Sequence, residues 1–131
     1  MEAVWRWGLL SGVAIVVVDL AAALLSAGQP DVSQQLIAAQ TVDLLANLSI
    51  YALCGFRVGN LTRVVRSAAE AGVTAGLLAG IAAIVAGQVI APPASADLLP
   101  PIGVLAENIA MGGLLAAASG FLGMRAPEPK R

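Results

Sequence analysis

The sequence has no histidine, a single cysteine, and few charged or aromatic side chains. Only 11 % of its 131 residues are charged and 4 % are aromatic, whereas soluble domains carry about 25 % charged residues. One cysteine cannot form an intramolecular disulfide, and without histidine the usual zinc ligand sets are missing. A net charge of −1 provides no basic surface for nucleic acid. We therefore expect no metal, cofactor or nucleic-acid partner. Because no nucleophile lies in a recognisable arrangement with a base, we also expect no enzymatic activity.

Apolar residues are what the chain has in abundance. They make up 59 % of the sequence, and the mean hydropathy is +0.88. Soluble domains are typically about 45–50 % apolar, and disordered chains combine low hydrophobicity with high charge. This composition therefore excludes both classes and makes the lipid bilayer the expected solvent.

Four apolar stretches divide the chain, each about 20 residues long, as a hydrocarbon core of about 30 Å requires. They cover residues 8–27, 36–56, 71–91 and 102–124, and a short tail follows at 125–131. Segments containing proline, 28–31 and 92–101, separate the first stretch from the second and the third from the fourth. The connection at 57–66 is polar or partly helical. We predict an all-α integral membrane protein with four transmembrane helices, arranged as an antiparallel bundle of two helical hairpins.

The first stretch also fits a secretory signal peptide, since Leu25-Ser26-Ala27 is similar to a cleavage site. Two features favour a retained helix instead. Asp19 interrupts the apolar run. The segment before the run is weakly charged, because Glu2 offsets Arg6, whereas a signal peptide begins with a positively charged segment.

The basic residues are distributed unevenly between the two ends of the predicted helices. They are confined to the N-terminus, the second connection and the C-terminus: Arg6, Arg57, Arg63, Arg66, Arg125, Lys130 and Arg131. The first and third connections contain Asp31 and Asp97 and no base. The positive-inside rule therefore predicts that both termini are cytoplasmic. Because arginine outnumbers lysine and alanine is abundant, we expect a bacterial source with a GC-rich genome, and hence the bacterial cytoplasmic membrane.

Three acidic residues lie inside the predicted spans, at similar depths. Asp19, Asp43 and Glu107 lie roughly 12, 10 and 8 Å from the outer boundary at 1.5 Å per residue. No basic residue is available at this depth. Each carboxyl must therefore be protonated, hydrogen-bonded to neutral partners, exposed to water or bound to a cation.

Polar residues on two helical faces extend this group. Gln40, Asp43 and Asn47 share one face of the second stretch, and Asn108 lies on the small-residue face of the fourth, about 100° from Glu107. The candidate proton- or cation-binding residues are Asp19, Asp43, Glu107, Gln40, Asn47 and Asn108. The alternative is that these side chains only hydrogen-bond between helices, at about 0.6 kcal/mol each.

Glycines recur at helical spacing in the third and fourth stretches. The expected packing residues are Gly72, Gly76, Gly80, Gly87, Gly112 and Gly123. Small residues allow two helix backbones to approach closely. We favour packing within one chain, of the third helix against the fourth; a homodimer interface or a larger membrane complex is the alternative.

Two functions fit these features. The first is a structural or accessory subunit of a membrane assembly, in which the polar residues hold helices together. The second is a small proton- or cation-coupled transporter that uses the intramembrane carboxylates. The sequence favours the first because it shows no substrate pocket.

Overall fold

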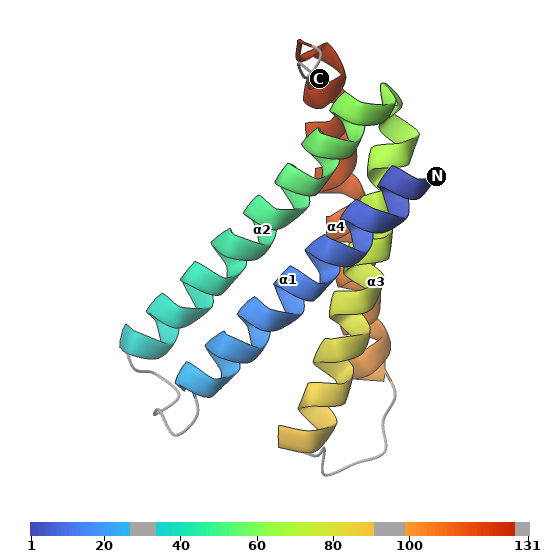
Figure 1. The fold of residues 1–131 in the computed structure, drawn as a ribbon. Coiled ribbons are helices and arrows are strands. Elements are labelled where there is room, and N and C mark those ends of the chain that lie inside the picture. The colour runs from blue at the N-terminus through green and yellow to red at the C-terminus, as the bar shows by residue number, and fades with distance from the viewer. Residues whose placement is uncertain (27–33, 91–98, 128–131) are drawn as a thin grey trace.

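The computed structural model describes residues 1–26, 34–90 and 99–127, which form four helices (Figure 1). Helix α1 spans Glu2–Ser26, α2 spans Gln34–Thr62, α3 spans Val65–Ile90 and α4 spans Leu99–Arg125. All four are long and apolar enough to cross a membrane. The prediction of an all-helical chain with four helices of spanning length is confirmed.

The helices extend beyond the apolar stretches of the sequence. α1 begins at Glu2, α2 continues past Phe56 to Thr62, and α3 begins at Val65. The polar segment between the second and third stretches is therefore mostly helical. Pro100 and Pro101, expected in a connection, belong to the first turn of α4, where a missing N–H removes no intrahelical hydrogen bond. The expected turn at 28–31 and the segment 92–98 lie outside the described residues, as do Lys130 and Arg131.

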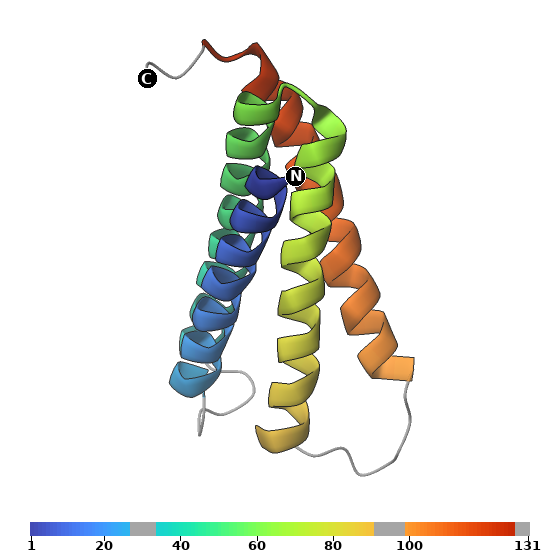
Figure 2. The same cartoon turned by 45° about the vertical axis from the view of Figure 1, so that its right-hand side comes forward.

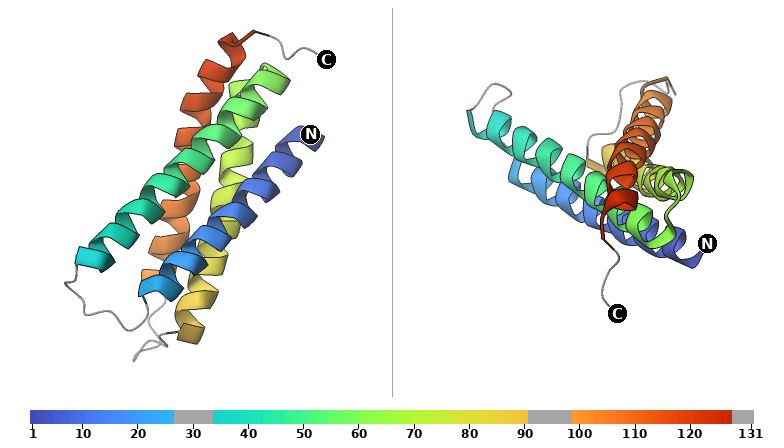
Figure 3. Two further views of the ribbon diagram at one scale, coloured as in Figure 1. Left: turned by 60° about the vertical axis from the view of Figure 1, so that its left-hand side comes forward. Right: turned by 90° about the horizontal axis from the view of Figure 1, so that it is seen from above.

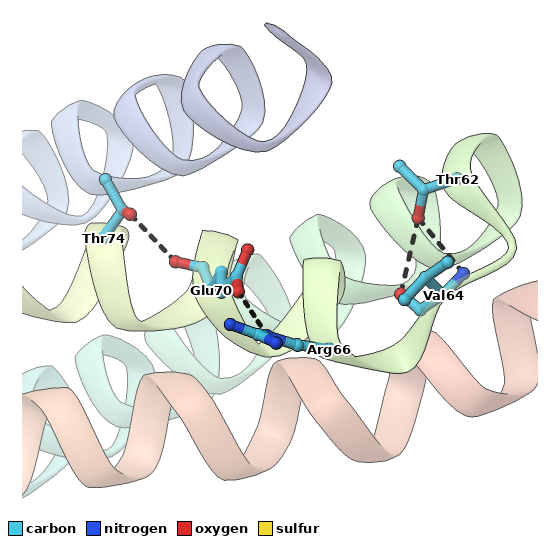
Figure 4. Close-up of polar contacts among 5 residues, drawn as sticks. All are labelled: Thr62, Val64, Arg66, Glu70 and Thr74. Carbon is cyan, nitrogen blue, oxygen red and sulfur yellow. Dashed lines mark hydrogen bonds and ion pairs between the residues drawn. The ribbon is translucent and has the colours of Figure 1, made fainter. Parts of the chain in front are cut away.

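The turn between α2 and α3 consists of two residues, Arg63 and Val64. Arg63 adopts a left-handed conformation with φ of 57°, and its N–H donates to Gly59 O at 2.9 Å, which ends α2 as a C-terminal cap does. Thr62 Oγ1 donates to Val58 O at 2.8 Å. It also accepts from the Val64 N–H at 3.3 Å (Figure 4). Side chain and backbone together close this turn tightly.

The N-terminus, the α2–α3 turn and the end of α4 lie at the same end of the molecule, which we call the turn end (Figures 1 and 2). α1 and α4 each pack against both α2 and α3, but they do not contact one another within the described ranges. Towards the opposite end, α1 and α2 separate from α3 and α4 (Figure 3). The bundle is therefore closed at the turn end and splayed at the other.

Small side chains fill the interior. One buried cluster at the turn end contains Val4, Cys54, Val58, Ala68 and Ala71, and a second contains Ile15, Tyr51, Ala75 and Ala79. Large apolar side chains lie on the outside, with Leu24 67 % and Leu114 73 % exposed. An interior of small residues under an apolar exterior is typical of helices that pack in a bilayer, because lipid tails solvate leucine as well as a protein core does.

Glycines bring the helix backbones into direct contact. A Cβ on Gly72 of α3 would overlap the Gly112 carbonyl of α4, and a Cβ on Gly76 would overlap the Asn108 carbonyl. Gly59 of α2 meets the Gly120 backbone in the same way. No side chain fits at these positions, so glycine sets the distance between the helices.

The other glycines expected at packing positions have different surroundings. Gly80 packs on Leu105 of α4, whereas Gly123 packs on the Phe56 carbonyl of α2 rather than on α3. Gly87 is exposed and has nothing within 4 Å of an added Cβ. Close glycine contacts that the sequence reasoning missed occur in α1 and α2, at the same four-residue spacing: Gly8, Gly12, Gly55 and Gly59.

Candidate functional site

A hydrogen bond between two polar side chains joins α1 to α2 in the splayed half of the bundle. Asn47 Nδ2 donates to Asp19 Oδ1 at 2.6 Å, and both side chains are half-buried. A hydrogen bond of this length is strong in surroundings of low dielectric constant. The two residues came from different apolar stretches of the sequence, and only the fold brings them together.

Asp43 lies one helical turn before Asn47 on the same side of α2. Its carboxyl is close enough to Asp19 to interact with it electrostatically. Asp43 Oδ1 and Asn47 Oδ1 are both buried and have no hydrogen-bond partner among the described residues. Burial of an unpaired polar oxygen is costly. Beside the Asp19 carboxyl, the structure thus gathers acceptor oxygens for which the described chain supplies no donor.

Tyr51 continues the polar side of α2 by one more turn and connects it to α4. The phenol is fully buried, and its hydroxyl donates to Asn108 Oδ1 at 3.5 Å, which is the outer limit of a hydrogen bond. Asn108 Nδ2 donates in turn to Val104 O at 3.0 Å within α4. We call Asp19, Asp43, Asn47, Tyr51 and Asn108 the polar cluster; it links α1, α2 and α4.

Two other candidate residues from the sequence lie apart from this cluster. Gln40 on α2 and Glu107 on α4 are exposed, and neither makes a hydrogen bond or ion pair with the cluster in the described structure. Within the described ranges, no group of three or more histidine, cysteine, aspartate or glutamate side chains converges as a metal site would require.

The described arginines lie at the turn end, far along the helices from the polar cluster, and four of them have contacts there. Arg63 Nη1 donates to Met124 O and, at 2.7 Å, to Ala126 O. A guanidinium at this position satisfies carbonyls that the C-terminus of α4 leaves unpaired.

The remaining basic contacts at this end are more exposed. Arg66 pairs with Glu70 at 2.8 Å one helical turn away (Figure 4). Arg57 lies 5.8 Å from the centre of the Trp7 ring, and Arg125 lies 4.3 Å from that of Phe121. None of these contacts neutralises Asp19 or Asp43.

An apolar groove of about 790 Å³ lies between α1 and α3, in the angle where the two helices separate (Figure 2). Val16, Asp19, Leu20 and Ala23 form its α1 wall, and alanine, leucine, isoleucine and valine side chains between Leu78 and Gly87 form its α3 wall. Among the described residues of the lining, Asp19 alone is charged. The same carboxyl therefore belongs to the polar cluster on one side and borders an apolar groove on the other.

A buried polar contact that the sequence reasoning missed joins α1 and α2 nearer the turn end. Cys54 Sγ contacts Trp7 O at 3.6 Å, and Ser11 is buried beside the closely packed Gly8 and Gly12. The small-residue spacing of Gly8, Ser11 and Gly12 is the signal that indicates this face. These groups pack α1 against α2, and in the described structure no hydrogen bond joins them to the polar cluster.

Comparison with protein-family models, with curated proteins and with solved structures finds no match.

Proposed function

We propose that this chain is a multi-pass protein of the bacterial cytoplasmic membrane, with its four helices antiparallel and both termini cytoplasmic. Support comes from four helices of spanning length and apolar exterior. The described arginines at the turn end agree with the cytoplasmic side under the positive-inside rule. The polar cluster then lies in the outer half of the bilayer.

Within that membrane, the protein is proposed to be a small proton- or cation-coupled carrier that binds its ion at Asp19 and Asp43. The observation behind this proposal is the unpartnered, buried Oδ1 of Asp43 beside the Asp19–Asn47 hydrogen bond. An ionisable residue inside a membrane is expensive, and its usual reason is function. A proton shared between the two carboxyls, or a small cation among the oxygens of Asp19, Asp43 and Asn47, would supply the missing partner.

The polar cluster is also placed where a change of shape would affect it. It lies in the splayed half of the bundle and connects helices on both sides of the splay, α2 on one side and α4 on the other. The Tyr51–Asn108 contact, at 3.5 Å, is its weakest link. A movement that opens or closes α2 against α4 would break or shorten this contact and so alter the surroundings of the carboxyls.

The second candidate is an accessory subunit of a membrane assembly. It is favoured by the Asp19–Asn47 bond itself, which already links α1 to α2 as an interhelical hydrogen bond does. On this proposal, the polar cluster only holds the helices in register and no ion moves.

Labelling with a hydrophobic carbodiimide separates the two candidates. The reagent modifies protonated carboxyls inside membranes, so the purified protein is treated in lipid nanodiscs over a range of pH and analysed by mass spectrometry. A carrier is expected to label at Asp43 or Asp19, with labelling that falls as the pH rises. Asp43→Asn and Asp19→Asn identify the site, and Glu107→Gln, at an exposed carboxyl on α4, is the matched control.

Proteoliposomes containing a pH-sensitive dye then test whether the protein moves ions across the membrane. The carrier predicts that Asp43→Asn abolishes an ion flux that Glu107→Gln retains, with both variants folded. Absence of labelling at either aspartate at every pH, or a full flux in the Asp43 variant, would overturn the carrier and favour the accessory subunit.

A further inference from the structure

The groove between α1 and α3 combines a large apolar surface with one carboxyl. Its volume of about 790 Å³ lies within the range of about 300–1,000 Å³ that is typical of small-molecule sites. Such sites are mostly apolar, with a few polar groups that fix the ligand's orientation. Val16, Leu20 and Ala23 stand on either side of Asp19 along the α1 wall.

The charge of the surroundings defines the polar end of an occupant. Asp19 borders the groove, and Asp43 interacts with Asp19 from α2. No arginine of the described helices lines the groove, because those residues lie at the turn end. An anionic head group would be repelled here, whereas a cationic one would be attracted and would find a hydrogen-bond acceptor.

The apolar walls define the rest of the occupant. On α3 the wall consists of small and aliphatic side chains, including Leu78, Ile81, Ala82 and Ala86, which offer no hydrogen-bonding side chain. The groove is partly open, and it lies between two helices whose outer faces are apolar. A molecule dissolved in the bilayer can therefore enter from the side.

We infer that this groove binds a lipophilic amine, a molecule with a compact apolar body and a single cationic head, whose ammonium group meets the Asp19 carboxyl. The inference rests on the proposed carrier, because it names the class of substrate that the carrier's aspartate receives. It goes beyond that proposal in placing the substrate between α1 and α3 and in giving its route of entry from the lipid.

Three probes with one apolar body test the head group. Binding of 1-adamantanamine, 1-adamantanol and 1-adamantanecarboxylate to the protein in uncharged lipid nanodiscs is measured by calorimetry, with empty nanodiscs as the blank. The amine is expected to bind at least tenfold more tightly than the alcohol, and the carboxylate not at all. Asp19→Asn is expected to lower the affinity for the amine to that for the alcohol. Glu107→Gln is expected to leave the preference unchanged.

Two substitutions test the place of binding. Ala86→Phe fills the groove from α3, and Ala23→Phe fills it from α1, where the residue is exposed and a larger side chain is tolerated. Both are expected to abolish binding of the amine and the alcohol alike. Ala118→Phe, on the exposed face of α4, is the matched control. Size-exclusion chromatography and circular dichroism of each variant show whether it is folded.

The outcomes are separable from those of the carbodiimide experiment. Equal binding of amine and alcohol, a preference that survives Asp19→Asn, or binding that both groove-filling variants retain would each overturn the inference. If the amine does not bind in the groove but Asp43 or Asp19 is labelled as expected, the proposed carrier function is retained and its substrate binds elsewhere. Binding of the amine with no labelling of either aspartate would instead overturn the proposed ion coupling and keep the groove.

Discussion

The two ends of this molecule are built from the same kinds of helix but differ in how those helices meet. At the turn end, Gly55 and Gly59 bring α2 against α4, and a two-residue turn holds α2 to α3. At the opposite end, α1 and α2 separate from α3 and α4 (Figure 1). A Cβ added to Gly87 of α3 would meet no described atom within 4 Å. In the splayed region, the close contacts of Gly76 and Gly80 join α3 to α4, and they do not hold α1 and α2 against that pair.

The chemistry of the two regions differs in the same way. The turn end holds the described arginines, and four of them contact helix-end carbonyls, aromatic rings or Glu70. The splayed region holds Asp19 and Asp43, with buried oxygens that lack partners in the described chain. The turn end also has one buried oxygen without a described partner, Asn60 Oδ1, but the two such oxygens in the splayed region lie beside a carboxyl. A closely packed end can anchor the helices while a more open, acidic region binds and releases a ligand.

The largest expected difference in stability is between alanine substitutions at one glycine from each region. Gly72→Ala places a methyl group on the Gly112 carbonyl, so we expect a loss of about 1–3 kcal/mol in the free energy of unfolding, as for other overpacked sites. Gly87→Ala meets open space and gains the higher helix propensity of alanine, about 0.5–1 kcal/mol. Unfolding of both variants by SDS in mixed micelles measures the difference. Equal stabilities would show that α3 and α4 are not closely packed at Gly72.

A smaller effect is expected from the cap at the turn end. Arg63→Ala removes the guanidinium from Met124 O and Ala126 O, and we expect a cost of about 1–2 kcal/mol. Arg63→Gly loses the same bonds but relieves the left-handed φ of 57°, so it should retain about 1 kcal/mol more stability than the alanine variant. The exposed Arg66→Ala should change stability by less than about 0.5 kcal/mol. The same SDS titration ranks the stabilities of the three variants. If Arg66→Ala were as unstable as Arg63→Ala, the proposed capping of α4 by the Arg63 guanidinium would be contradicted.

The smallest effect is expected in the splayed region. Asn47→Ala removes the bond to Asp19, and interhelical hydrogen bonds in membranes contribute about 0.6 kcal/mol on average and at most about 1.7. The exposed Gln40→Ala should change nothing measurable. Under the carrier proposal, Asn47→Ala should also alter carbodiimide labelling of Asp19, because the carboxyl loses its donor. A loss of stability greater than that of Gly72→Ala would mean that the polar cluster, and not the glycine contact, holds the bundle together.

The sequence predicted features that depend on short segments of chain. Length and hydropathy predicted four helices of spanning size, and their existence is confirmed. The same reasoning ended the second helix at residue 56 and began the first and third helices at residues 8 and 71, with 57–66 as a polar or partly helical connection. The structure ends α2 later, at Thr62, and begins α1 and α3 earlier, at Glu2 and Val65. Helix formation needs only local hydrogen bonds, so α2 continues through polar residues to Thr62. The left-handed Arg63 carried no signal, since glycine is the residue expected there.

Helical spacing alone placed Gln40, Asp43 and Asn47 on one side of α2, and glycines at four-residue intervals on α3. It could not say which helix each face would meet. Gly123 packs on α2, Gly87 packs on nothing, and Glu107 stays apart from the other acids. The period of a helix fixes the direction of a side chain about its own axis, whereas its partner depends on how the helices cross. The sequence by itself therefore determined the apolar class and the helices, while the tertiary structure alone decided that Asp19 meets Asn47 and borders a groove.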